Sequence, residues 1–176
     1  IRAKWIDAEQ KTLLLDERLW TLTPGDAAEF TLDLELTLTA AAGPVTFGKS
    51  HFGLVALRVA KGMGTKDGGG TITNSERRLN EEQLMPHRRA RWCDYSGRST
   101  AATVEGITLL DHPDNPNHPG YFHVRGDGWM GSSFSEEADV VVTKEQPLRL
   151  KYRLHIHRGA ADPDKIDAAW RDWAGR

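Results

Sequence analysis

The feature that most constrains the fold is a strict alternation of apolar and polar residues from Phe30 to Leu38. Every second residue is Phe or Leu, and the residues between them are Thr, Asp or Glu. Because successive side chains of a β-strand point to opposite faces, a period of two predicts a strand with one buried face. The same alternation runs from Leu148 to His157, where the second face carries basic residues and histidines.

Shorter apolar runs, separated by Gly and Pro turn residues, predict the other strands. They lie at residues 12–23, 54–60, 71–73, 90–95, 104–110 and 140–142. Many strands without alternating helices are typical of an all-β fold. We therefore expect an antiparallel β-sandwich, with residues 61–82 and 111–131 as two long polar loops that carry a functional site.

One helix is expected at the C-terminal end. Asp162 is placed to cap it, and Pro163 suits its first position. One face of this helix is apolar and should pack on the sheet; its members are Ile166, Ala169, Trp170 and Trp173.

Length and composition fit one soluble domain over residues 1–176. The chain has 23 Lys+Arg against 25 Asp+Glu, a net charge of -2, so neither nucleic acid nor a membrane surface is an expected partner. A single Cys93 excludes an internal disulfide. The sequence starts at Ile1 without Met, so we expect a domain truncated at its N-terminus, and the compartment stays open between cytoplasmic and exported.

The segment from Asp111 to Arg125 concentrates chemically active side chains. It holds three His, three Pro, two Asp and two Asn. Imidazoles titrate near neutral pH, so His112 and His123 are candidates for acid/base chemistry, and Asn115 and Arg125 for substrate binding. A solvated surface loop and a metal site using His112, His118 and His123 are the alternatives.

Two further segments carry candidates. Asn74 and Glu76 follow a Gly-Gly-Gly run, where they suit sugar hydroxyls or proton transfer, or form an Asx turn instead. Lys49 lies in a match to the phosphate-loop string that runs from Gly43 to Ser50. The strand-like residues around this string argue against nucleotide binding, because a phosphate loop needs a helix after it.

Trp129 lies among glycines, where an indole can stack on the C–H face of a sugar ring. His155 and His157 share one strand face with three basic residues, so we expect that face to be solvated rather than metal-binding.

Four segments together resemble a bacterial family of unknown function that is labelled "methane oxygenase PmoA". They are FGKSHFGLVALRVAKGM from Phe47, GGGTITNSE from Gly68, ARWCDYSG from Ala90, and GITLLDHPDNPNHPGYFHVRGDGW from Gly106. The label names a membrane enzyme, whereas this sequence has no apolar run of membrane-spanning length, so we treat it as a misnomer.

The resemblance covers about residues 5–170 and implies the C-terminal part of a longer chain. It further implies a β-sandwich similar to the large sandwich of aldose mutarotases, and an association with carbohydrate-degrading enzymes. One departure is that Arg77 and Arg78 stand where the family usually has Gly after Asn-Ser-Glu.

The sequence thus predicts a carbohydrate-active protein that acts on a saccharide or sugar derivative as an epimerase, lyase or hydrolase. The expected catalytic residues are His112, His123 and Glu76; the expected substrate-binding residues are Lys49, His51, Asn74, Asn115, Arg125 and Trp129. A small-molecule or oligosaccharide ligand is expected, with no cofactor and no metal. The alternatives are a non-catalytic carbohydrate-binding module and a metal-dependent enzyme that uses three of His51, His112, His118 and His123.

Overall fold

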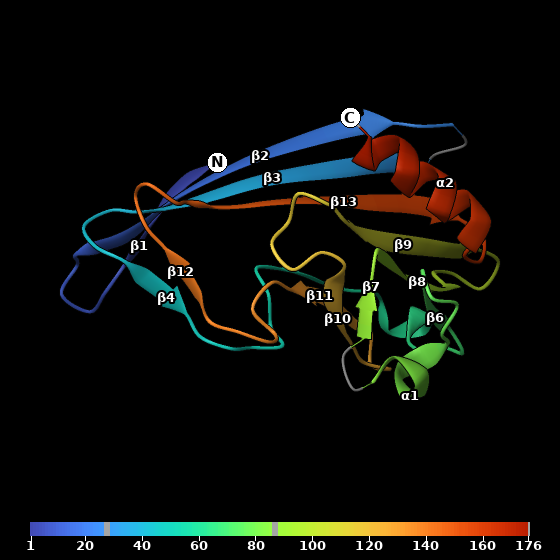
Figure 1. Ribbon diagram of the computed structural model, residues 1–176. Coiled ribbons are helices and arrows are strands. Elements are labelled where there is room, and N and C mark those ends of the chain that lie inside the picture. The colour runs from blue at the N-terminus through green and yellow to red at the C-terminus, as the bar shows by residue number, and fades with distance from the viewer. Residues whose placement is uncertain (27–28, 86–87, 176) are drawn as a thin grey trace.

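The fold consists of antiparallel sheets packed face to face, with a helix over one outer face (Figure 1). The computed structural model describes residues 1–26, 29–85 and 88–175. This arrangement confirms the predicted all-β class and the C-terminal helix. Within the described residues, no helix is both long enough and apolar enough to cross a membrane.

The larger sheet has seven strands in the order β1-β2-β3-β13-β9-β8-β6. In that order they span Arg2–Ile6, Thr12–Pro24, Phe30–Ala40, Leu148–Arg158, Val104–Asp111, Trp92–Arg98 and Thr71–Asn74. The two strands with strict alternation, β3 and β13, pair with each other at its centre.

The smaller sheet has four strands in the order β5-β11-β10-β7, and β12 pairs with β4 in a separate ribbon. These strands span Val55–Arg58, Trp129–Ser133, Gly120–Val124, Arg88–Ala90, Val140–Val142 and Val45–Phe47. β10 lies inside the segment 111–131 that was predicted as a polar loop, and β11 begins inside it, so that prediction was wrong. Phe122, Val124 and Met130 face the core, whereas the outward positions combine Tyr121 and Trp129 with His, Gly and Ser residues.

The core lies between the two sheets. Leu34, Leu36 and Leu38 of β3 are each at most 2 % exposed, and they belong to one apolar cluster with Phe122 and Met130 of the smaller sheet. The period-two pattern therefore identified the buried face correctly.

Helices contribute little to the core. A 3₁₀ turn, η1, spans Lys61–Met63, and a short helix, α1, spans Asn80–Leu84. The main helix, α2, spans Pro163–Ala174, and the Asp162 side chain accepts hydrogen bonds from its first turn at 3.2 Å, as predicted. Its Ile166 and Trp173 pack on Trp92 and Leu110, on the face of the larger sheet that points away from the core.

A buried polar network occupies the same outer face beside α2. His157 Nε2 lies 2.8 Å from Asp94 Oδ2, which also accepts a hydrogen bond from Thr108 at 2.7 Å. Gly106 is opposite His157 in the neighbouring strand, and a Cβ at Gly106 would lie 2.3 Å from the imidazole Cε1. The expectation of a solvated face was thus wrong for His157, which is buried. Gly106 has no side chain, so the His157 ring can pack over it and reach Asp94.

Gly106→Ala should destabilise the protein by about 1 to 3 kcal/mol, since the new methyl group must displace a buried ring. Urea unfolding measures this loss. Gly43→Ala is the matched control, because a methyl group there would meet no atom within 4 Å apart from its chain neighbours. Equal stabilities for the two variants would contradict the packing described.

Protonation of His157 should stabilise the fold. Burial disfavours the imidazolium, but the hydrogen bond and charge of Asp94 outweigh burial and raise the pKa of His157 above its ordinary 6.5. A raised pKa gives stability that is complete below the unfolded-state pKa and is lost as the pH rises through the folded-state pKa. The free energy of unfolding should therefore fall more between about pH 6 and pH 8 in the wild type than in His157→Gln. Parallel pH profiles would contradict this role.

Candidate functional site

The outward face of the smaller sheet gathers the predicted side chains His123 and Trp129. In β10 and β11, Phe122, Val124 and Met130 belong to the core. Because side chains alternate, His123 and Trp129 point to the opposite face. The residue paired with His123 is Gly131, so the partner strand places no side chain directly beside the imidazole.

The loop between β4 and β5 lies against this face. Ser50 N donates to Ser135 O at 3.1 Å, and Ser133 Oγ donates to Ser50 O at 2.5 Å. At Gly53 a Cβ would lie 1.7 Å from Ser132 O, so only glycine permits this approach. These contacts bring His51 and Phe52 next to His123.

Four rings meet there, and we call them the imidazole–aromatic cluster: His51, Phe52, His123 and Trp129. The His51 and His123 ring centroids are 5.1 Å apart at 90°, and Phe52 lies 5.1 Å from His123 and 6.2 Å from Trp129. Phe52 is 54 % exposed, whereas His123 is 8 % exposed. The cluster thus has an exposed aromatic side and a largely buried imidazole.

Charged side chains border the cluster at Trp129. The Arg58 guanidinium lies 5.7 Å from the indole centroid, and both Arg58 and Arg125 form ion pairs with Asp127. Partial desolvation opposes ionisation of Asp127, but the two guanidiniums outweigh it and lower the pKa of this carboxyl. Beside Trp129 there are therefore two guanidinium groups, which donate hydrogen bonds, and one ionised carboxylate, which accepts them.

Sequence reasoning missed Phe52, Arg58 and Asp127. Phe52 neighbours the candidate His51 and Asp127 precedes Trp129 by two residues, so adjacency was the available signal. Arg58 carried no such signal, because only the pairing of β5 with β11 sets it opposite Trp129.

His112 lies on the other side of the sandwich. It follows β9, and its ring contacts Trp173 of α2 edge to face at 4.8 Å. Its Nδ1 accepts a hydrogen bond from Asp114 N at 3.1 Å, and burial lowers its pKa. The packed core of the sandwich therefore separates His112 from His123.

Glu76 also lies on the α2 side. Ser75 Oγ donates to its carboxylate at 3.0 Å, and Arg91 approaches it at 3.7 Å. Arg91 in turn pairs with Asp167 of α2 at 3.1 Å. These contacts place Glu76 with α2, away from the imidazole–aromatic cluster.

Asn74 and Asn115 have structural contacts. The Asn74 side-chain oxygen accepts from the backbone N–H groups of Glu76 and Arg78, which is the Asx-turn alternative. The Asn115 amide donates to Asp111 at 2.7 Å and to Lys151 O at 2.8 Å, and it accepts from Lys151 N at 2.7 Å. Asn115 therefore ties the loop after β9 to β13.

The remaining predicted residues flank the cluster. Lys49 is exposed two residues before His51, and its backbone N–H donates to Asp139 at 2.9 Å. Arg125 belongs to the border already described. Of the nine predicted residues, the structure thus brings His51, His123, Arg125 and Trp129 together.

The histidines proposed for a metal site diverge. His118 Nδ1 lies 2.6 Å from Asp111, and its ring stacks on Trp170 of α2. His123 lies on β10 of the smaller sheet, and His51 lies beside it. Over residues 1–26, 29–85 and 88–175, no three His, Cys, Asp or Glu side chains are grouped to hold a metal ion.

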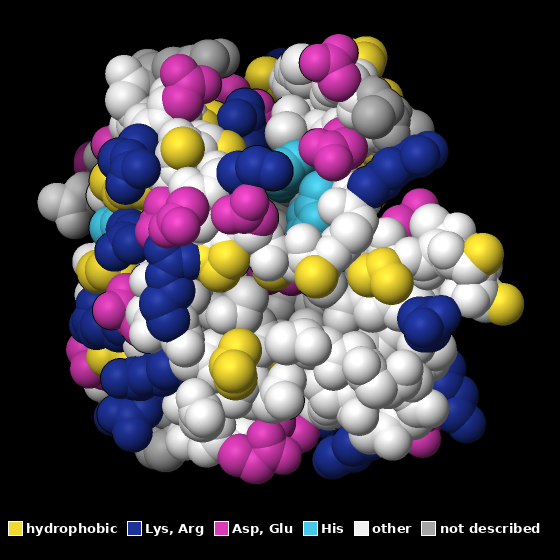
Figure 2. All heavy atoms as spheres, turned by 90° about the vertical axis from the view of Figure 1, so that its right-hand side faces the viewer, with side chains coloured by type: hydrophobic (Ala, Val, Ile, Leu, Met, Phe, Trp, Pro, Cys, Tyr) yellow, Lys and Arg dark blue, Asp and Glu magenta, His cyan; other side chains and the backbone are white. Residues whose placement is uncertain are grey.

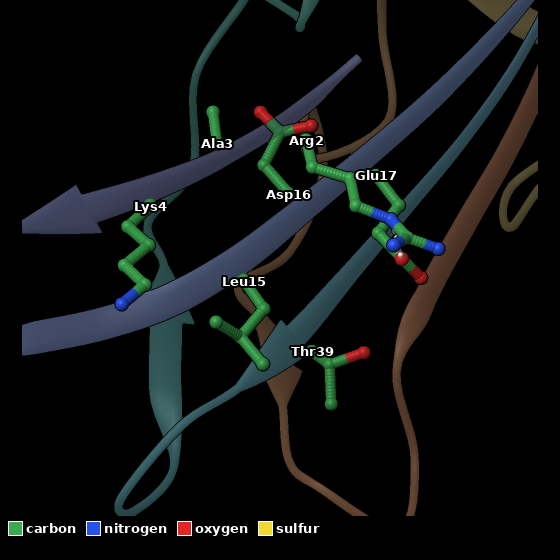
Figure 3. A pocket seen from close by; sticks show the side chains of 7 residues that line it. All are labelled: Arg2, Ala3, Lys4, Leu15, Asp16, Glu17 and Thr39. Atoms are coloured by element: carbon green, nitrogen blue, oxygen red, sulfur yellow. Dashed lines mark ion pairs between the residues drawn. The ribbon is translucent and has the colours of Figure 1, made fainter.

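A separate hollow lies over β1, β2 and β3 (Figure 3). Arg2, Lys4, Leu15 and Glu17 are among its lining residues, and Arg2 pairs with Glu17 at 3.0 Å. Both partners of this ion pair are largely exposed, so it contributes little stability. The hollow contains none of the predicted site residues.

Asn115→Ala should cost about 2 to 3 kcal/mol of stability, because Lys151 N and the Oδ1 atom of buried Asp111 lose the hydrogen bonds that Asn115 gives them. Ligand binding at the imidazole–aromatic cluster should be unchanged at temperatures where the variant is folded. Thermal unfolding and a binding titration test both statements. A stable variant with impaired binding would instead place Asn115 at the ligand.

Comparison with known proteins gives a family but no characterised relative. A family described as "Family of unknown function (DUF6807)" matches residues 1–171, and the methane oxygenase label is not part of that description. Neither a curated protein nor a solved structure matches the chain. The chain therefore belongs to DUF6807, a family of unknown function.

Proposed function

We propose that the imidazole–aromatic cluster binds a saccharide or a sugar derivative. The observation that carries this proposal is the meeting of His51, Phe52, His123 and Trp129 on the outward face of the smaller sheet. The centroids of their contacting rings are 4.5 to 6.4 Å apart. They come from the loop before β5 and from two adjacent strands, so the sheet fixes their positions.

The chemistry of the cluster suits a sugar ring. A pyranose has an apolar C–H face, which packs on an exposed aromatic ring such as Phe52. Its hydroxyl groups both donate and accept hydrogen bonds, as do the imidazoles. Arg125 and Asp127 at the border add a donor and an acceptor for hydroxyls at the ring edge.

Binding without catalysis is favoured over the acid/base site predicted from the sequence. That site had Glu76, His112 and His123 as its catalytic residues, but Glu76 and His112 lie with α2 on the other side of the core from His123. A ligand on the smaller sheet would meet neither of them.

A second candidate is proton transfer by His51 and His123. It is favoured by the perpendicular approach of the two imidazoles at 5.1 Å, which lets a bound hydroxyl contact both rings. This candidate requires turnover of a bound sugar, whereas simple binding does not.

Phe52→Ala should weaken saccharide binding about fivefold, because aromatic contacts of this kind contribute about 1 kcal/mol. Isothermal titration against monosaccharides, oligosaccharides, sugar acids and keto sugars would measure the change. Leu22→Ala is the matched control, since Leu22 is 61 % exposed on β2.

Three results separate the possibilities. Saccharide binding that Phe52→Ala weakens and Leu22→Ala preserves supports the proposal. Conversion of the bound sugar, lost in His123→Gln while binding persists, supports proton transfer. Absence of binding to every compound in the panel would overturn both candidates.

A further inference from the structure

A second polar hollow lies where β2 ends and β3 begins, beside the end of β13. Its volume is about 280 Å³, and its lining includes Pro24, Glu29, Phe30, Thr31, Arg153 and His155. Figure 2 faces this end of the molecule and shows histidine side chains set between acidic and basic ones. The hollow belongs to the larger sheet and is separate from the imidazole–aromatic cluster.

The buried network next to the hollow fixes its histidines. His157 is 7 % exposed and is committed to Asp94 through Nε2. The His155 ring lies 5.4 Å from the His157 ring, and its Nε2 is 3.5 Å from Glu29 Oε2. His155 is thus the imidazole that lines the hollow, with Glu29 beside it.

Among the described residues that line the hollow, the charged side chains are Glu29 and Arg153. Arg153 is neutralised by two hydrogen bonds to Asp33, at 2.6 and 2.7 Å, and its guanidinium also lies over the Trp173 ring. His157 and Asp94 form a second neutral pair. Arg153 thus has an ionic partner in Asp33, whereas the Glu29 carboxylate lies beside the imidazole of His155.

The protonation states of Glu29 and His155 determine which ligands suit the hollow. A backbone hydrogen bond from Arg158 and the adjacent His155 lower the pKa of Glu29. Burial and the charge of His157 lower the pKa of His155. Near neutral pH the hollow therefore presents an ionised carboxylate, which accepts hydrogen bonds, beside a neutral imidazole whose Nε2 faces that carboxylate.

We propose that this hollow binds a small organic ammonium ion. The N–H groups of the ion donate to the Glu29 carboxylate next to the His155 ring, and its short hydrocarbon part lies against Pro24 and Phe30. An anion is disfavoured, because Glu29 repels it and the guanidinium of Arg153 is already paired with Asp33.

Three probes of equal chain length and different charge test this inference: propylammonium, 1-propanol and propanoate. NMR of the imidazole signals in the full chain near neutral pH, with His155 assigned through His155→Gln, follows each titration. Propylammonium should give a saturable shift of the His155 signal, and the other two probes should give none.

Variants then identify the carboxylate. Glu29→Gln keeps the shape and the acceptor for Arg158 N–H but removes the charge, so the affinity for propylammonium should fall at least about tenfold. Glu145→Gln removes an exposed carboxylate at the other end of β13 and should leave the affinity unchanged.

The wild-type probe series decides the matter even if Glu29→Gln fails to fold. Absence of a saturable shift with propylammonium, or equal shifts with 1-propanol, would overturn the proposal. So would unchanged affinity in folded Glu29→Gln. This inference does not depend on the proposed saccharide site, because its readout is a different histidine and a different class of ligand.

Discussion

The packing of the leucine face of β3 against the apolar residues of β10 and β11 is the constraint on which the rest of the structure depends. Leu34, Leu36 and Leu38 are buried because the smaller sheet covers them. Because side chains alternate along a strand, the residues that face the core also determine which residues face outward from each sheet. His123 and Trp129 must point outward from the smaller sheet, and His157 must point outward from the larger one.

The same constraint explains which parts of the fold the sequence could predict. Alternation in β3 and β13 is strong because one face of each strand meets a continuous core. β10 and β11 escaped prediction because their outward face carries His, Ser and Gly, and Pro residues precede them. Capping residues act over a few positions, so Asp162 and Pro163 located α2 without tertiary information.

The candidate site was harder to predict, because proximity along the chain does not decide which side of the sandwich a residue faces. His112 and His123 are only eleven positions apart, yet the loop between them passes from the larger sheet to the smaller one. Phe52 reaches His123 only because Gly53 allows close contact with Ser132. His157 was assigned to solvent because its partners, Asp94 and Gly106, lie on other strands.

Hydrogen-bond capacity separates structural polar groups from candidate functional ones. Asn115 uses its amide donor and its carbonyl acceptor on the backbone of β13 and on Asp111, so a ligand would have to break native contacts to reach it. Asp94 is similarly committed to Ser96, Thr108 and His157. Phe52 and Glu29, by contrast, keep exposed surface beside rigid strands. Burial of an ionised or polar group is costly unless its partners are fixed, so Asp94 and Asn115 stabilise the sheet through their hydrogen bonds. Ligand binding is then left to side chains at the surface, such as Phe52 and Glu29.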